Sequence, residues 1–315
     1  MQKKLLTLPI SYFSITLGLF AIGLGWRQYE AMQGLESAVS SAILMASNSI
    51  WLLFVLFYVA KFMFNFAQVK TEFLNQVQCC FFSLIPITLM LFSLSIKPHF
   101  QALAGVLIGV GTLAQLVFSA YRSAGLWRGG HPVEATTPIL YLPTVAANFV
   151  SAIALKSLDL PNYAMLFFGM GMISWLTLEP AILQRLRNAT PIAEATRPIL
   201  SIQLAPAFVA VNTYLHIVDG KLDYFALALI GYGLLQLLFL LRLLPWIVQN
   251  SFKISFWGFS FGLASMATAG VYLMGSPEWG MDTLGYVFFV FGSACIALLV
   301  LGTLVQLLRG KFFPA

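Results

Sequence analysis

Ten apolar stretches of about 20 residues each run along this sequence, and they constrain its fold more than any other feature. A helix of ~20 apolar residues is long enough to cross the hydrocarbon core of a bilayer, which is about 30 Å thick. Because a helix satisfies its own backbone hydrogen bonds, such stretches are stable in lipid as helices and not as open sheets. We therefore predict an all-α integral membrane protein, with residues 1–315 forming a single transmembrane domain. The ten transmembrane helices are expected at roughly 9–27, 38–60, 79–96, 101–121, 139–157, 161–178, 199–218, 223–243, 254–275 and 283–307.

The composition supports this class of protein and excludes others. Only 9% of the residues are charged and 60% are hydrophobic, whereas soluble domains carry about 25% charged residues. The net charge of +6 comes from 17 basic residues scattered along the chain, which form no basic patch for nucleic acid. Cys79, Cys80 and Cys295 lie in or beside apolar stretches without metal-ligand spacing. We expect no metal, no cofactor and no nucleic-acid partner.

The distribution of basic residues predicts the orientation in the membrane. Lys3 and Lys4 precede the first apolar run, but that run extends through Trp26, longer than the apolar core of a signal peptide, so we expect an uncleaved first helix. An even number of spans puts both termini on one side, and the connections on that side hold 13 of the 17 basic residues. Loops rich in Lys and Arg stay in the cytoplasm, so both termini are predicted to be cytoplasmic. The four basic residues of the opposite side are Arg27, Lys97, Lys156 and Lys221.

A repeat is visible within this pattern. Even-numbered spans end in related phrases, such as LAQLVFSAYR and LLQLLFLLRL, and four of the five odd-numbered spans carry a proline within or near their start. The repeating unit is therefore a helical hairpin that occurs five times in the same orientation, which predicts an arrangement around an axis along the membrane normal. Polar side chains at membrane depth collect in the odd-numbered spans. Because such groups need protein or a wet cavity around them, the odd-numbered helices are expected to line a central pathway.

The ninth span carries a phenylalanine in an unusual setting. At about 100° per residue, Phe261 shares its helix face with the small or polar residues Gly258, Gly262 and Ser265. We predict that this face looks into the pathway and that Phe261 occludes it, the alternative being that Phe261 packs against a neighbouring helix. The opposite stripe of the same span consists of Phe252, Phe256, Phe259 and Leu263.

The predicted pathway favours anions. No Asp or Glu lies well inside an odd-numbered span, which leaves no carboxylate steps for a proton or cation relay. Where a proline interrupts a helix, the helix that begins after it has free backbone N–H groups in its first turn, and these can face a negative charge. Side-chain hydroxyl groups can replace some of the water molecules that hydrate an anion. Each proline could equally be a packing kink. The further pore-lining or hinge candidates are Phe13, Pro86, Thr88, Pro143, Thr144 and Pro206.

The sequence contains no pattern typical of an enzyme. His99, His131 and His216 are scattered and pair with no Cys or Asp at a spacing suited to a nucleophile or a metal. Glu179, in LEPAILQRLR, is interpreted as a structural ion-pair partner near the cytoplasmic interface, with Arg185 and Arg187 downstream.

Five segments together resemble one family, the tellurite-resistance/dicarboxylate transporters that include the bacterial TehA proteins. Its other members include the plant guard-cell slow anion channel and the yeast malate permease. The resemblance extends from about residue 6 to 310. The segments are LPISYFSITLGL, HPVEATTPILYLPTVAANF, LEPAILQRLR, IQLAPAFVA and FWGFSFGLASMA.

This resemblance implies a homotrimer in the bacterial inner membrane, with five inner helices around a pore in each protomer and five outer helices around them. It implies that the pore is blocked by a phenylalanine of the ninth helix, and the FSFG motif places that residue at Phe261. It also implies conduction of small anions such as chloride and nitrate, with tellurite resistance as a phenotype.

Two other functions remain open from the sequence. One is a proton-coupled transporter of C4-dicarboxylates or of tellurite and other oxyanions, which the lack of carboxylates in the odd-numbered spans disfavours. The other is a non-conducting scaffold or receptor, which the short loops disfavour because they offer little docking surface.

Overall fold

The computed structural model describes residues 7–249 and 252–313, and every regular element in these ranges is a helix. Within them, ten helical segments are long and apolar enough to cross a membrane, which confirms the predicted all-α class and the number of spans. Lys3 and Lys4, which entered the charge count, lie outside the described residues. The spans are Ile10–Gln33, Ala38–Phe64, Gln78–Ile96, Gln101–Leu126, Pro138–Lys156, Pro161–Asn188, Thr196–Ile217, Tyr224–Ile247, Ile254–Met274 and Asp282–Leu308.

Each odd-numbered span consists of two parts, a 3-10 or π-helical segment followed by an α-helix. Proline has no N–H and its ring crowds the carbonyl four residues earlier, so it fits best in the first turn of an α-helix. Accordingly Pro86 and Pro206 lie in the first turn of their α-helices, and Pro143 lies in the π segment. The pairs are η1 (Ile10–Tyr12) with α2 (Phe13–Gln33), η2 (Gln78–Ser83) with α5 (Leu84–Ile96), η4 (Pro138–Leu140) and the π segment η5 (Leu142–Ala146) with α7 (Ala147–Lys156), η6 (Glu194–Leu204) with α9 (Ala205–Ile217), and η7 (Ile254–Phe259) with α11 (Ser260–Met274).

The ninth span has the same two-part form without a proline. Ser260, the first residue of α11, donates its hydroxyl hydrogen bond to the carbonyl of Trp257 at 2.7 Å. Ser83, at the end of η2, does the same to the carbonyl of Cys80 at 2.6 Å. A side-chain bond to the carbonyl three residues earlier competes with regular α-helical bonding, so a serine at the joint accompanies the change of helix type in both spans.

The even-numbered spans are uninterrupted α-helices on the outside of the bundle. In the most apolar stretch of each odd-numbered span 67–89% of the residues are buried, against 28–33% in the even-numbered spans. The outer surface of large apolar side chains therefore suits contact with lipid. These outer helices are α3 (Ala38–Phe64), α6 (Gln101–Leu126), α8 (Pro161–Asn188), α10 (Tyr224–Ile247) and α12 (Asp282–Leu308).

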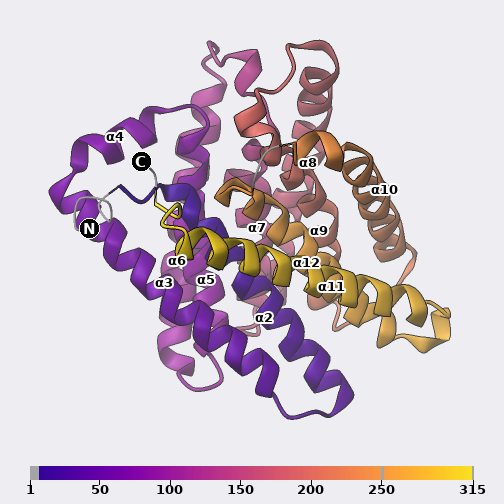
Figure 1. Ribbon diagram of the computed structural model, residues 1–315. Coiled ribbons are helices and arrows are strands. Elements are labelled where there is room, and N and C mark those ends of the chain that lie inside the picture. The colour runs from indigo at the N-terminus through magenta and orange to yellow at the C-terminus, as the bar shows by residue number, and fades with distance from the viewer. Residues whose placement is uncertain (1–6, 250–251, 314–315) are drawn as a thin grey trace.

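The inner helices contact one another in a closed ring. Going around it, α2 packs on α5, α5 on α7, α7 on α9, α9 on α11, and α11 again on α2. Each inner helix is backed by the outer helix that follows it in the chain, as α2 is by α3 and α11 by α12 (Figure 1). The two ends of the described chain meet, because the Tyr12 hydroxyl donates a 2.5 Å hydrogen bond to the carbonyl of Phe312.

The backbones of α11 and α12 approach closely at Gly270 and Gly285. A Cβ atom at Gly285 would lie 2.7 Å from the carbonyl oxygen of Gly270, so the helices would have to separate. We expect Gly285→Ala to lower the free energy of unfolding by about 1–3 kcal/mol, as overpacking does. The matched control is Gly231→Ala on α10, where an added Cβ meets nothing within 4 Å and alanine is the better helix former. Thermal unfolding in detergent measures both, and equal midpoints would contradict this packing.

Candidate functional site

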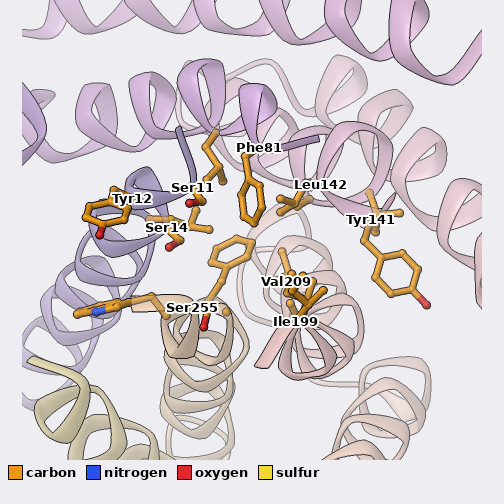
Figure 2. Close-up of a pocket in the computed structure, with 18 of the residues that line it drawn as sticks. Ser11, Tyr12, Ser14, Phe81, Tyr141, Leu142, Ile199, Val209 and Ser255 are labelled. Atoms are coloured by element: carbon orange, nitrogen blue, oxygen red, sulfur yellow. The ribbon is translucent and has the colours of Figure 1, made fainter. Parts of the chain in front are cut away.

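A cavity of about 210 Å³ lies inside the ring of inner helices, at the end where the odd-numbered spans begin (Figure 2). Every residue that lines it belongs to an odd-numbered span, and each of the five spans contributes. The side chains are mostly apolar, with a few hydroxyl and amide groups and no Asp, Glu, Lys, Arg or His among the described lining residues. The cavity is thus an uncharged vestibule enclosed by the five spans. One lining residue from each span in order is Ser14, Phe81, Tyr141, Pro206 and Phe261.

The lining residues that lie farthest along each of the five spans are all apolar. Phe261 lies in the first turn of α11 and is only 7% exposed. The lining residues farthest along the five spans are Leu17, Leu84, Phe149, Val209 and Phe261.

Three of the residues singled out from the sequence line the vestibule together: Phe261, Gly258 and Pro206. Two others from the same helix face do not. A Cβ atom at Gly262 would lie 2.8 Å from that of Leu204 on η6, and the Ser265 carbonyl accepts a 2.8 Å hydrogen bond from Asn212 on α9. Gly262 and Ser265 therefore join the ninth span to the seventh.

The remaining candidates from the sequence do not line the vestibule, and two of them face the outer helix α3. Phe13 packs edge-on against Phe54 and Tyr58 of α3, with 6.0 Å between ring centroids in each pair. Thr88 accepts a 2.9 Å hydrogen bond from the Trp51 indole of α3. Three further candidates contact their neighbours through backbone carbonyls. The carbonyl of Pro86 lies close to Gly111 of α6, and the carbonyl of Pro143 accepts a hydrogen bond from the Ser119 hydroxyl of α6. The carbonyl of Thr144 accepts a hydrogen bond from the side-chain amide of Asn148, one turn later in the same span.

Sequence reasoning missed several aromatic residues of the vestibule, among them Phe81 and Tyr141. Phe81 points into it from η2, and Tyr141 lines it from the start of the fifth span, with its hydroxyl directed away (Figure 2). Both lie in or next to segments that are not α-helical, where a periodicity of 100° per residue does not apply. The sequence signal that could have identified Phe81 and Tyr141 was their position a few residues before Pro86 and Pro143.

Glu179 has a role different from the predicted ion pair with Arg185 or Arg187. Its carboxylate, on α8, accepts hydrogen bonds from neutral donors: Tyr141 at 2.5 Å and the Trp175 indole at 2.8 Å on one oxygen, Gln203 at 2.6 Å and Tyr232 at 2.6 Å on the other. The ion pairs among the described residues are Lys61–Glu72 and Lys156–Asp219. The prediction failed because Arg185 and Arg187, six and eight residues downstream, lie about 9 and 12 Å farther along the axis of α8, at a rise of ~1.5 Å per residue.

Basic side chains of the opposite end of the ring reach from one inner span to the next. Arg27 on α2 donates to the carbonyls of Leu94 and Ser95 at the end of α5, at 3.1 and 3.0 Å. Lys97, the first residue after α5, donates a hydrogen bond to the backbone carbonyl of Ser157, the first residue after α7.

Lys156, at the end of α7, continues this pattern through an ion pair with Asp219 at 2.8 Å. The Lys156 ammonium holds the pKa of the Asp219 carboxyl below its usual range, by hydrogen bonding and by charge. Positive charge at helix C-termini is electrostatically favourable.

The fold and vestibule define a multi-pass helical membrane protein with an uncharged internal cavity. The family model described as voltage-dependent anion channel, SLAC1, matches residues 7–305. The chain therefore belongs to the SLAC1 family of anion channels.

Known relatives fall into two groups. The chain is 43% identical over 308 residues to the tellurite resistance protein TehA homolog of Haemophilus influenzae, covering 97% of this chain and 93% of that protein. It is 23% identical over 317 residues to the guard cell S-type anion channel SLAC1 of Arabidopsis thaliana, and 20% identical over 280 residues to the S-type anion channel SLAH2 of the same plant. The alignments cover 56% and 53% of those two longer proteins. These relatives are named for anion conduction and for tellurite resistance, not for an enzymatic activity.

Proposed function

We propose that this protein is an anion-selective channel that passively conducts small monovalent anions such as chloride and nitrate. The pathway runs along the axis of the ring formed by the five odd-numbered spans, as five same-orientation hairpins around a central pore, and Phe261 is its gate. The observation that carries this proposal is the vestibule, which is lined by all five odd-numbered spans, holds no charged side chain among its described residues, and has Phe261 in its lining. The names of the relatives support anion transport.

Basic residues favour anions at the end of the proposed pathway where the odd-numbered spans begin. The termini and connections at that end hold 13 of the 17 basic residues. A positive potential at the entrance raises the local anion concentration, and its effect falls as ionic strength rises.

The setting of the channel follows from the same proposal. We place the protein in a bacterial inner membrane as a homotrimer, with residues 1–315 forming one channel domain per protomer and a pathway in each. Both termini are placed in the cytoplasm, in agreement with the excess of basic residues on that side and with the contact between Tyr12 and Phe312. An association with tellurite resistance is proposed from the name of the Haemophilus influenzae relative.

A proton-coupled transporter of C4-dicarboxylates or oxyanions is the second candidate, because Glu179 lies within a membrane span and contacts the vestibule residue Tyr141. Anion efflux from proteoliposomes separates the two functions, with the wild type and Phe261→Ala measured side by side. A channel gives chloride efflux that requires a potassium carrier to balance charge and is insensitive to a proton uncoupler. Accumulation of malate or tellurite that needs a proton gradient and is abolished by the uncoupler would contradict the channel.

A further inference from the structure

The four strongest hydrogen bonds to Glu179 join two layers of the bundle. Trp175 and Tyr232 lie on the outer helices α8 and α10, whereas Tyr141 and Gln203 belong to the fifth and seventh spans, which are inner. One carboxylate in a membrane span therefore fixes two neighbouring inner spans to two outer helices.

The two inner donors occupy matching places in their spans. Tyr141 lies between η4 and the π segment η5, two residues before Pro143. Gln203 lies near the end of η6, three residues before Pro206. Both are therefore at the joint where the irregular part of the span gives way to the α-helix, and a proline leaves such a joint with fewer backbone hydrogen bonds to hold its angle.

The joints shape the wall of the vestibule. Tyr141 contributes its ring to the lining while its hydroxyl points away from the cavity (Figure 2). The residues that follow the two joints, Leu142 and Ala205, also line the vestibule. Any change in the angle of a joint moves these lining residues relative to the other three spans.

We propose that Glu179 is a positioning residue that clamps the joints of the fifth and seventh spans and thereby sets the width of the vestibule, and with it the size of anion that passes. Glu179 acts through Tyr141 and Gln203 and does not itself touch the anion. A carboxylate suits this role because it accepts several hydrogen bonds at once, and each bond to an ionised group is stronger than a neutral one. This inference rests on the proposed channel function.

A matched pair of hydroxyl deletions in the Phe261→Ala background tests the clamp. Tyr141→Phe and Tyr232→Phe each remove one hydrogen bond to Glu179, at 2.5 and 2.6 Å, the first from an inner span and the second from an outer helix. The measured quantity is the permeability of nitrate and of a larger anion, gluconate, relative to chloride, from reversal potentials in planar bilayers. We expect Tyr141→Phe to change these ratios at least about twofold, the effect of losing a coupling of ~0.5 kcal/mol within a hydrogen-bond network, and Tyr232→Phe to leave them unchanged.

Two further variants keep the test decisive. Gln203→Met removes the second inner donor without a change in length, and Glu179→Gln removes the charge; both are expected to change the ratios in the same direction as Tyr141→Phe. A purely structural network would lower the thermal midpoint in all four variants and leave the ratios alone, which would overturn the clamp. Equal ratios for Tyr141→Phe and Tyr232→Phe would also overturn it, whereas a silent Phe261→Ala parent would refute the channel itself.

Discussion

Replacement of Phe261 by alanine is expected to raise the chloride conductance of the reconstituted protein by about tenfold or more, the change that ~1.4 kcal/mol of lost barrier produces. Phe261 is 7% exposed and lines the vestibule together with Leu17, Phe149 and Val209. An apolar neck gates by excluding water, so removal of the ring opens the neck without adding a charge. Selectivity for anions over cations should therefore persist. Single-channel recording under a chloride gradient measures both quantities.

Phe259 provides the matched control, two residues away on the same span. It lines a separate apolar groove between α10 and α12, together with Phe252, Phe256 and Leu263. Phe259→Ala removes the same number of atoms outside the vestibule and is expected to leave conductance at the wild-type level. Phe261→Leu, which keeps an apolar side chain of similar bulk, is expected to remain nearly closed. An increase of similar size in Phe261→Ala and Phe259→Ala would show that loosened packing, and not an opened neck, raises the current.

The sequence predicted those features of the fold that depend on residues close together in the chain. The length and spacing of apolar stretches predicted all ten spans. The stripe of Phe252, Phe256, Phe259 and Leu263 was assigned to one helix face, and these four residues do share one groove. The helix ends were less accurate: α8 was expected to end at residue 178 and continues through Pro180 to Asn188. Its last turns are polar, and hydropathy reports only the part of a helix that lies in hydrocarbon.

The vestibule was only partly predictable, for two physical reasons. In a ring of five helices each member also touches two neighbours, so only a narrow strip of its surface faces the axis, and Gly262 and Ser265 fall on the flank toward the seventh span. The carboxylate of Glu179 gathers donors from four different spans. Contacts between different spans produce no periodic pattern in the sequence from which they could be predicted.

Replacement of Lys61 by methionine is expected to lower the free energy of unfolding by about 3–5 kcal/mol, the cost of breaking a buried ion pair from one side. The Lys61 ammonium is fully buried at the end of α3 and lies 2.7 Å from Glu72, on the short helix α4 (Phe66–Leu74). It also donates a 2.9 Å hydrogen bond to the carbonyl of Leu8, directly before the first span, and Tyr58 donates to the same carboxylate. Its loss leaves the Glu72 carboxylate without its counter-charge and the Leu8 carbonyl without its donor. The thermal midpoint in detergent measures the effect.

A double-mutant cycle separates the charge from the packing. Glu72→Leu combined with Lys61→Met removes both charges, and such a replacement is often close to neutral, so the double variant should recover most of the stability that Lys61→Met loses. Lys70→Met, on the exposed side of α4, should have little effect, because surface charges contribute at most about 1 kcal/mol. If Lys61→Met and Lys70→Met proved equally mild, the ion pair would not be what anchors α4. If the predicted pattern holds, the same ammonium ties α3, α4 and the start of the first inner span into one unit at the entrance of the vestibule.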